Sequence, residues 1–172
     1  MPSEILVVGL YGIPEVTAGD DISHLICEAL ARQDILIEPG DILVVTQKIV
    51  SKSEGRIIML EDIEPSTAAI QMSKEHHRDP RHTEIILRES ARIIRMEKGN
   101  IISETHHGFK CANAGVDASN VPRDGAVALL PVDPDASASR IREGIKDRLD
   151  TDVAIIVSDT FGRPWREGAV NV

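Results

Sequence analysis

The feature that most constrains the fold is an uninterrupted aliphatic run at residues 153–157, "VAIIV". Five consecutive aliphatic residues predict a strand that is buried on both faces. Asp159 and Thr160 follow at its carboxyl end, which is where open sheets usually bind ligands. A carboxylate beside a hydroxyl suits Mg²⁺, which takes oxygen ligands and keeps phosphate oxygens in its shell. The alternative is that Asp159 caps a turn or a helix.

Strands and helices are interleaved along the whole chain, but without a regular βαβ rhythm. Strands are expected at 4–8, 42–46, 93–96, 101–103, 109–115 and 152–157, with "QKIVSKSEGR" beginning as a strand and ending as a loop. Helices are expected at 21–33 after Asp20 or Asp21, at 67–77 after Ser66, from Pro80 to Ile94, and after Asp135 or Ser137. The pattern favours a mixed α/β, or α+β, fold in one domain spanning 1–172.

Composition and charge restrict the partners. Hydrophobic residues make up 42% and aromatic residues 2%, so the core is expected to be aliphatic. A net charge of −9 argues against nucleic acid or an anionic membrane as a partner. No apolar run approaches the roughly 20 residues of a membrane span, and no basic secretory leader begins the chain. We expect a soluble, cytoplasmic protein that binds small anions only through a divalent cation or a local group of lysines and arginines.

A second carboxylate, Asp117, lies in "NAGVDASNV", residues 113–121. Asn, Gly, Asp and Ser are turn residues, so this stretch is consistent with an Asx-turn that simply joins two strands. The same small residues also let a backbone come close to a charged ligand. Since Asp117 and Asp159 both follow strand-like runs, the two carboxylates could share a metal ion and its phosphate.

A basic stretch, "TQKIVSKSEGR", places Lys48, Lys52 and Arg56 within nine residues. Their small and hydroxylic neighbours suit phosphate binding. The alternative is a solvated edge strand, which lysines commonly protect from pairing. The standard glycine-rich motifs for dinucleotides and for P-loops are absent from the sequence, and so are zinc-ligand spacings of histidine and cysteine.

Four segments in this order closely resemble the coenzyme F420-0:L-glutamate ligases. They are "GIPEVTAGDDI", "TQKIVSKSEGR", "NAGVDASNV" with the following "LLPVDPDASA", and "SDTFGRPWREG". The resemblance implies an α+β fold particular to that family and an intertwined homodimer. It also implies a GTP-dependent ligase that adds L-glutamate to F420-0, a deazaflavin coenzyme precursor. GTP would activate the precursor's carboxylate as an acyl phosphate, and the glutamate amine would then form the amide, releasing GDP and phosphate.

Residue roles are carried over position by position from this resemblance. Asp117 and Asp159 match metal-binding aspartates, and Thr160 matches a ligand of a second metal; Mg²⁺ or Mn²⁺ is implied, often with K⁺. The positions that match nucleotide contacts are Gly12, Ile13, Pro14, Thr46, Gln47, Lys52 and Asn120. Arg163 and Arg166 stand beside the metal site, where we expect anion contacts. The resemblance leaves the catalytic acid and base unassigned.

The sequence departs from the family pattern at its end. Family members continue past the position of Val172, with a further acidic metal ligand and a glycine-containing nucleotide loop. We therefore expect a chain that carries part of the nucleotide site. Two alternatives stay open: a non-catalytic dimerising or regulatory fragment, and a related ligase with another carboxylate acceptor.

Overall fold

The computed structural model describes residues 4–97, 99–119, 121, 123–160, 162 and 170–172. It has a mixed α+β fold, which confirms the predicted class. The helices are α1 (Ile22–Arg32), α2 (Gln47–Ser53), α3 (Thr67–His76), α4 (Pro80–Arg88) and α5 (Pro134–Leu149), with short 3₁₀ turns η1 (Leu60–Asp62) and η2 (Asn113–Gly115). The strands are β1 (Ile42–Thr46), β2 (Ile57–Met59), β3 (Ser90–Glu97), β4 (Asn100–Thr105), β5 (Lys110–Ala112), β6 (Ala126–Ala128), β7 (Ala154–Asp159) and β8 (Val170–Asn171).

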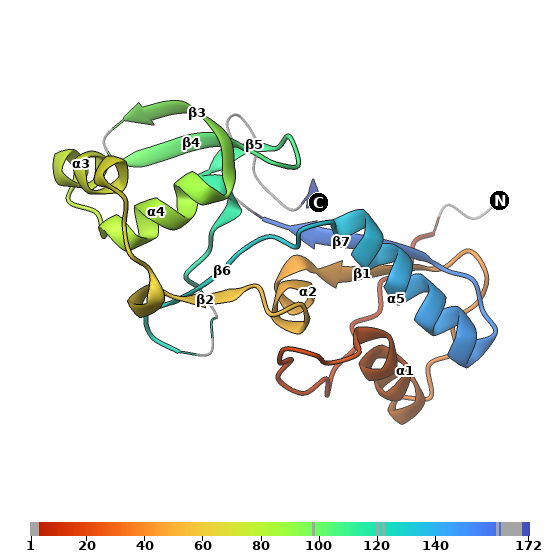
Figure 1. The fold of residues 1–172 in the computed structure, drawn as a ribbon. Coiled ribbons are helices and arrows are strands. Elements are labelled where there is room, and N and C mark those ends of the chain that lie inside the picture. Colours follow the sequence, from red (N-terminus) through yellow and green to blue (C-terminus); the bar gives the residue numbers. More distant parts are fainter. Residues whose placement is uncertain (1–3, 98, 120, 122, 161, 163–169) are drawn as a thin grey trace.

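The molecule has two lobes, each around its own apolar core (Figure 1). The first lobe holds α1, β1, α2, α5, β7 and β8, and its core includes Ile26, Val45 and Ile145. The second lobe is formed by the continuous stretch from β2 to β6, and its core includes Ile85, Ile101 and Leu129. Both cores are almost entirely aliphatic, as the composition predicts.

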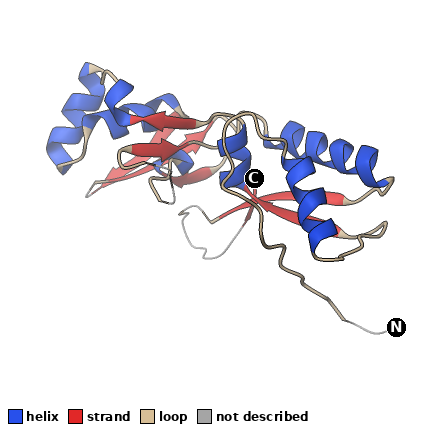
Figure 2. Ribbon diagram, turned by 90° about the horizontal axis from the view of Figure 1, so that it is seen from below, coloured by secondary structure: helices blue, strands red, loops and turns tan. Residues whose placement is uncertain are grey.

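The sheet of the first lobe has the order β1-β7-β8, with β1 and β7 parallel. Helices α1 and α5 lie on one side of it (Figure 2). Leu43 and Val45 point into the core beneath these helices, whereas Ile42 and Val44 are 58% and 65% exposed. Alternate side chains of a strand point to opposite faces, so one helical layer covers only half of each strand. Ala154, which pairs with Ile42, is exposed as well, so the prediction that 153–157 is buried on both faces is wrong.

The expected strand at 4–8 is also wrong. This segment has no regular structure, and Ile5, Leu6 and Val7 are at least 84% exposed. Apolar, β-branched residues form a strand only where neighbouring strands and side chains receive them, and the described residues offer no such pairing here. The chain joins the core from Leu10 onward, and Val16 is buried.

Three other boundaries differ from the predictions. The segment 47–53 is a helix, because the buried Gln47 and Ser51 lie one turn apart and bond to each other. Helix α4 ends at Arg88 and not at Ile94, since β3 begins at Ser90 and pairs antiparallel with β4. Helix α5 starts after Asp133, whose carboxylate accepts from the Ala136 amide at 2.9 Å, with Pro134 as the first helical residue.

The second lobe contains the antiparallel sheet β3-β4-β5 and the pair β2-β6. The predicted caps Asp21 for α1 and Ser66 for α3 are confirmed, since their side chains accept amide protons from His24 and Ala69. Among the described residues, every helix falls short of the length and apolarity that crossing a bilayer would need.

Candidate functional site

The carboxyl ends of β1 and β7 bring two predicted site segments together. The two strands pair in register, with Val45 opposite Val157 and Thr46 opposite Ser158. Thr46 and Gln47 therefore emerge at the same edge of the sheet as Asp159 and Thr160. Asp159 Oδ1 accepts a hydrogen bond from the Thr160 amide at 2.8 Å.

The second aspartate is held by an unusual turn. Asn113, Ala114 and Gly115 all have left-handed backbone conformations, with φ of 54°, 54° and 72°. Beyond this turn the Asp117 amide donates to the Ala128 carbonyl at 3.0 Å, and the Ala128 amide donates back at 2.7 Å. This bridge to β6 fixes the backbone at Asp117 and sets where its carboxylate can reach.

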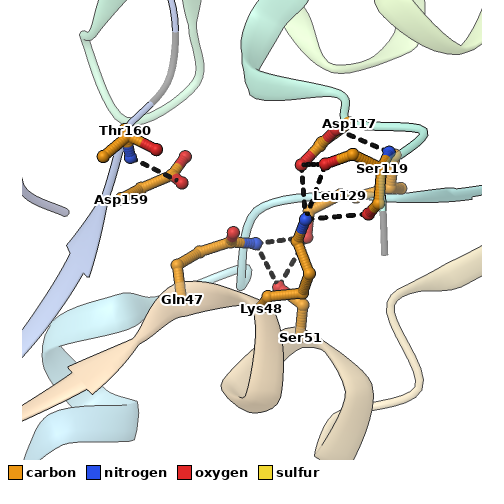
Figure 3. A network of polar contacts seen from close by, with 8 residues as sticks. All are labelled: Gln47, Lys48, Ser51, Asp117, Ser119, Leu129, Asp159 and Thr160. Carbon is orange, nitrogen blue, oxygen red and sulfur yellow. Dashed lines mark hydrogen bonds and ion pairs between the residues drawn. The ribbon is translucent and has the colours of Figure 1, made fainter. Parts of the chain in front are cut away.

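The Asp117 carboxylate forms the centre of a polar network (Figure 3). Lys48 Nζ lies 2.5 Å from Asp117 Oδ2 and also donates to the Ser119 carbonyl and hydroxyl oxygens at 2.8 and 3.1 Å. The Ser119 amide donates to Asp117 Oδ1 at 2.7 Å, which is the geometry of an Asx-turn. Burial raises the pKa of Asp117, but the hydrogen bonds from Lys48 and Ser119 outweigh it and hold the pKa below its usual value. The carboxylate is therefore charged at neutral pH.

The two aspartates face the junction between the lobes. The Ala112 amide of β5 donates to the Gly162 carbonyl at 2.6 Å, so Gly162 lies against the second lobe. Burial, together with the charge of Asp159, raises the pKa of the Cys111 thiol to about 11. Figure 3 shows Asp159 with Thr160 and Asp117 with Ser119 on either side of Gln47 and Lys48.

Gln47 is buried, and its amide nitrogen has a structural role. Nε2 donates to Ser51 Oγ at 2.6 Å and to the Leu129 carbonyl at 3.0 Å, and Ser51 donates to the same carbonyl. These bonds tie the start of α2 to the chain leaving the second lobe. A nucleotide contact by Gln47 would have to come from its carboxamide oxygen or its backbone.

Lys52 connects α2 to the predicted nucleotide loop Gly12–Pro14. Its ammonium group, largely buried, lies 2.5 Å from Glu15 Oε1, immediately after that loop. Gln33 Nε2 holds the other side of the loop by donating to the Tyr11 carbonyl at 3.0 Å. Gly12 has a φ of 76°, which favours glycine. The structure thus joins Lys52 to Glu15, the residue that follows these three predicted nucleotide positions.

Arg56 lies away from these groups, in contrast to the interpretation of the basic stretch as one phosphate-binding cluster. Its guanidinium donates to the Leu130 carbonyl at 3.0 Å and pairs with Glu89 at 2.7 Å, so it joins the lobes. Asn120, Arg163 and Arg166 lie outside the described residues. Sequence reasoning missed Glu15 and Ser119. The Asp-x-Ser spacing could have indicated Ser119, whereas the sequence holds no signal that pairs Glu15 with Lys52.

The donor set suits a hard divalent cation. The groups available are carboxylates of Asp117 and Asp159, the Thr160 hydroxyl and the Ser119 oxygens, and oxygen ligands are those that Mg²⁺ and Mn²⁺ take. In the part of the chain that the structure describes, no three side chains of His, Cys, Asp or Glu gather closely enough to hold a metal by themselves. The residues present fit a cation whose shell is completed by phosphate oxygens or water.

A pocket of about 390 Å³ lies elsewhere, between α1, the end of α2 and α5. Its arginines are already paired: Arg140 with Glu54 at 2.5 Å and Arg148 with Asp21 at 2.6 Å. Among the described residues, none of the predicted metal or nucleotide positions lines this pocket. The edge formed by β1, β7 and the Asp117 loop is the better candidate.

An aspartate at the carboxyl end of a strand, with a lysine–aspartate pair nearby, is typical of enzymes that handle phosphorylated ligands with a divalent cation. The chain belongs to the F420-0:Gamma-glutamyl ligase family, which it matches over residues 12–172. The family membership expected from the resemblance is thereby confirmed.

Individual relatives carry the name coenzyme F420:L-glutamate ligase. The chain is 49% identical to the one from Methanothermobacter thermautotrophicus, over 98% of this chain and 66% of the relative. Identity is 44% to the one from Methanopyrus kandleri, over 92% of this chain and 60% of the relative. Identity is 40% to the one from Methanocaldococcus jannaschii, over 98% of this chain and 65% of the relative. The chain therefore spans less than two thirds of the length of these curated relatives.

Proposed function

We propose that this chain carries the metal and nucleotide edge of a ligase that adds L-glutamate to F420-0 with GTP. The family supports the reaction class, and relatives up to 49% identical are named for glutamate ligation to coenzyme F420. The observation that carries the proposal is the parallel register of β1 and β7. It puts Thr46 opposite Ser158, directly before Asp159 and Thr160.

The proposed chemistry requires negative charges to be brought together. GTP, the F420-0 carboxylate and the acyl phosphate intermediate are all anionic, so cations must screen them before attack by the glutamate amine. Asp117, Asp159 and Thr160 would hold Mg²⁺ or Mn²⁺, which supplies Lewis-acid stabilisation of the phosphates. Lys52 and the backbone of 12–14 would contact the nucleotide, and K⁺ would be an additional cation.

The first experiment measures GTP binding by calorimetry with and without Mg²⁺ or Mn²⁺. Binding should require the metal and weaken at least about tenfold in Asp117→Asn and in Asp159→Asn, because each removes a charged ligand. Asp147→Asn, on the exposed side of α5, is the control and should bind normally. Metal-independent binding, or normal binding in both site variants, contradicts the proposal.

The acceptor is tested by phosphate release from GTP. Release should require both F420-0 and L-glutamate, and mass spectrometry should detect the glutamylated product. Release that depends on a different carboxylic acid in place of F420-0 would identify a related ligase with another acceptor. Metal-dependent GTP binding without turnover in any mixture would favour the non-catalytic alternative.

The uncovered sheet face favours assembly as a second function. Ile42 and Val44 are exposed, as are Ile5, Leu6 and Val7 near the N-terminus, and exposed apolar residues of this kind are typical of a protein–protein contact. We propose that it packs in a homodimer. Sedimentation velocity should give a dimer for the unmodified chain and a monomer for Val44→Lys. Val132→Lys, at another exposed valine, should remain dimeric, and a monomeric unmodified chain contradicts this proposal.

A further inference from the structure

Lys48 is the group at this edge that the family resemblance leaves without a role. Its ammonium group has three acceptors: Asp117 Oδ2 at 2.5 Å, the Ser119 carbonyl at 2.8 Å and the Ser119 hydroxyl at 3.1 Å. An ammonium has three protons to donate, so this position satisfies it completely. Lys48 comes from the first lobe and Asp117 from the second, which means the pair spans the junction.

The burial of the two side chains differs. The Lys48 side chain is 17% exposed, whereas that of Asp117 is 42% exposed. The carboxylate can therefore be approached from solvent while the lysine already covers part of it. A divalent cation arriving there would meet a positive charge next to its ligand, and two cations on one carboxylate repel each other.

We propose that Lys48 is a placeholder cation, which neutralises Asp117 before a divalent metal binds and then moves to a phosphate oxygen of the bound nucleotide. This inference rests on the proposed function. The lysine stem is long and flexible and its charge is compact, so its head can change partners without movement of α2. Thr46 and Gln47, which precede Lys48 directly, are predicted nucleotide contacts, so the phosphates would lie within its reach.

The exchange keeps the site balanced in charge. While Lys48 is on Asp117, the lysine compensates the carboxylate. When the metal replaces it, the metal brings two positive charges and the nucleotide brings several negative ones, and the displaced ammonium compensates part of these. The competing explanation is a purely structural one, in which Lys48 only ties α2 to the Asp117 loop.

The experiment measures Mn²⁺ binding to the nucleotide-free chain, by the electron paramagnetic resonance signal of free Mn²⁺. Lys48→Met should bind Mn²⁺ about tenfold more tightly than the unmodified chain, because its competitor is gone. Lys48→Arg should bind it more weakly, since a guanidinium holds a carboxylate through two parallel hydrogen bonds. Lys74→Met, which removes a lysine on the exposed side of α3, should leave the affinity unchanged.

If Lys48 only ties α2 to the Asp117 loop, Lys48→Met should not bind Mn²⁺ more tightly than the unmodified chain. Its Mn²⁺ affinity would then be unchanged or lower, and either result overturns the placeholder role. Thermal unfolding of each variant shows whether a low affinity follows from loss of folding. In that event Lys48→Arg decides alone, and Mn²⁺ binding equal to or tighter than that of the unmodified chain overturns the inference.

The nucleotide arm repeats the measurement with Mn²⁺ and GTP together. Lys48→Met should bind the Mn²⁺–GTP complex about tenfold more weakly, because a phosphate contact is lost. Normal affinity for the complex overturns the transfer to phosphate. If the unmodified chain itself fails to bind GTP, the proposed function fails, and the Mn²⁺ arm still decides whether Lys48 and metal compete for Asp117.

Discussion

Lys52 Nζ and Glu15 Oε1 lie 2.5 Å apart and join helix α2 to the segment that enters the first lobe. The lysine is largely buried, so removal of the Glu15 charge would leave a buried ammonium group without its ionic partner. Glu15→Gln should release the segment 10–16. We expect faster amide hydrogen exchange there, measured by mass spectrometry, with unchanged exchange in β4.

The control for that experiment is Glu4→Gln, which removes an exposed carboxylate from the same end of the chain. It should leave exchange across 10–16 unaltered. Equal exchange in Glu15→Gln and the unmodified chain would mean that Leu10 and Val16 hold this segment by packing alone.

Gly115 is where the Asp117 turn meets the core of the second lobe. Its φ is 72°, and a Cβ there would lie 2.9 Å from Leu130 Cδ1. Gly115→Ala should lower the free energy of unfolding by about 3 kcal/mol, from backbone strain and overlap together. Urea denaturation measures this loss.

Gly125 supplies the matched comparison. It has a similar φ of 79°, but its Cβ would find no atom within 4 Å. Gly125→Ala should cost only the backbone strain, about 1 kcal/mol. An equal loss of unfolding free energy at both positions would show that Leu130 moves away from the added Cβ without a loss of stability.

Arg78 holds the same turn from the other side. Both terminal nitrogens of its guanidinium donate to Asn113 Oδ1 at 3.1 Å, and one also donates to the Gly99 carbonyl. Arg78→Met should cost about 2 kcal/mol in the free energy of unfolding, the usual range for lost charged hydrogen bonds. Asn113→Gly removes the acceptor of two of these hydrogen bonds, so Arg78→Met should cost less in that background than in the unmodified chain. Strictly additive effects in thermal and urea unfolding would rule out this coupling.

Glu84 gives the protein a measurable acid response. Hydrogen bonds from Ser66, and then from Arg88, lower the pKa of Glu84 from 4.5 to about 2. A carboxyl group with a lowered pKa in the folded state stabilises the fold above its unfolded pKa and loses that effect as the pH falls. Glu84→Gln should therefore lower the unfolding free energy by about 1–2 kcal/mol at pH 7.

The difference between Glu84→Gln and the unmodified chain should shrink between pH 4.5 and about 2, where Glu84 becomes protonated. Urea denaturation at pH 7, 4 and 2.5 follows this change. A difference that stays constant across these values would show that the Glu84 charge has no part in stabilising the fold.

The sequence predicts those parts of the fold that depend on local signals. Asp21 and Ser66 precede apolar helical patterns and cap α1 and α3, and Gly99 marks the turn between β3 and β4. The predicted strand at 4–8 is wrong because strand propensity depends on packing against neighbouring strands, which a local sequence pattern does not reveal. The prediction for 47–53 is wrong because two buried residues of this helix, Gln47 and Ser51, are polar. A search for apolar residues at helical spacing therefore does not detect the helix.

For the candidate site, the rule for strand ends explains the part that could be predicted. It leads to Asp159 and Thr160, and the register of β1 and β7 brings Thr46, which the family resemblance indicated, to the same edge. The contact between Lys48 and Asp117 joins residues 69 positions apart and arises only from the way the second lobe packs on the first. Contacts of this kind are formed by the tertiary structure, and the spacing of the two residues along the chain does not indicate them.

The second lobe leaves the first at Arg56 and returns at Leu129, whose amide donates to the Arg56 carbonyl at 3.0 Å. This has a consequence for the folding rate. Strands β1 and β7 must find each other across more than a hundred residues, and such distant pairings close slowly. Once the second lobe has folded, its two ends are neighbours, and the connection between β1 and β7 is effectively shortened to α2, α5 and a few residues beside them. We expect the second lobe to form first, so that assembly of the parallel sheet has to overcome much less chain entropy.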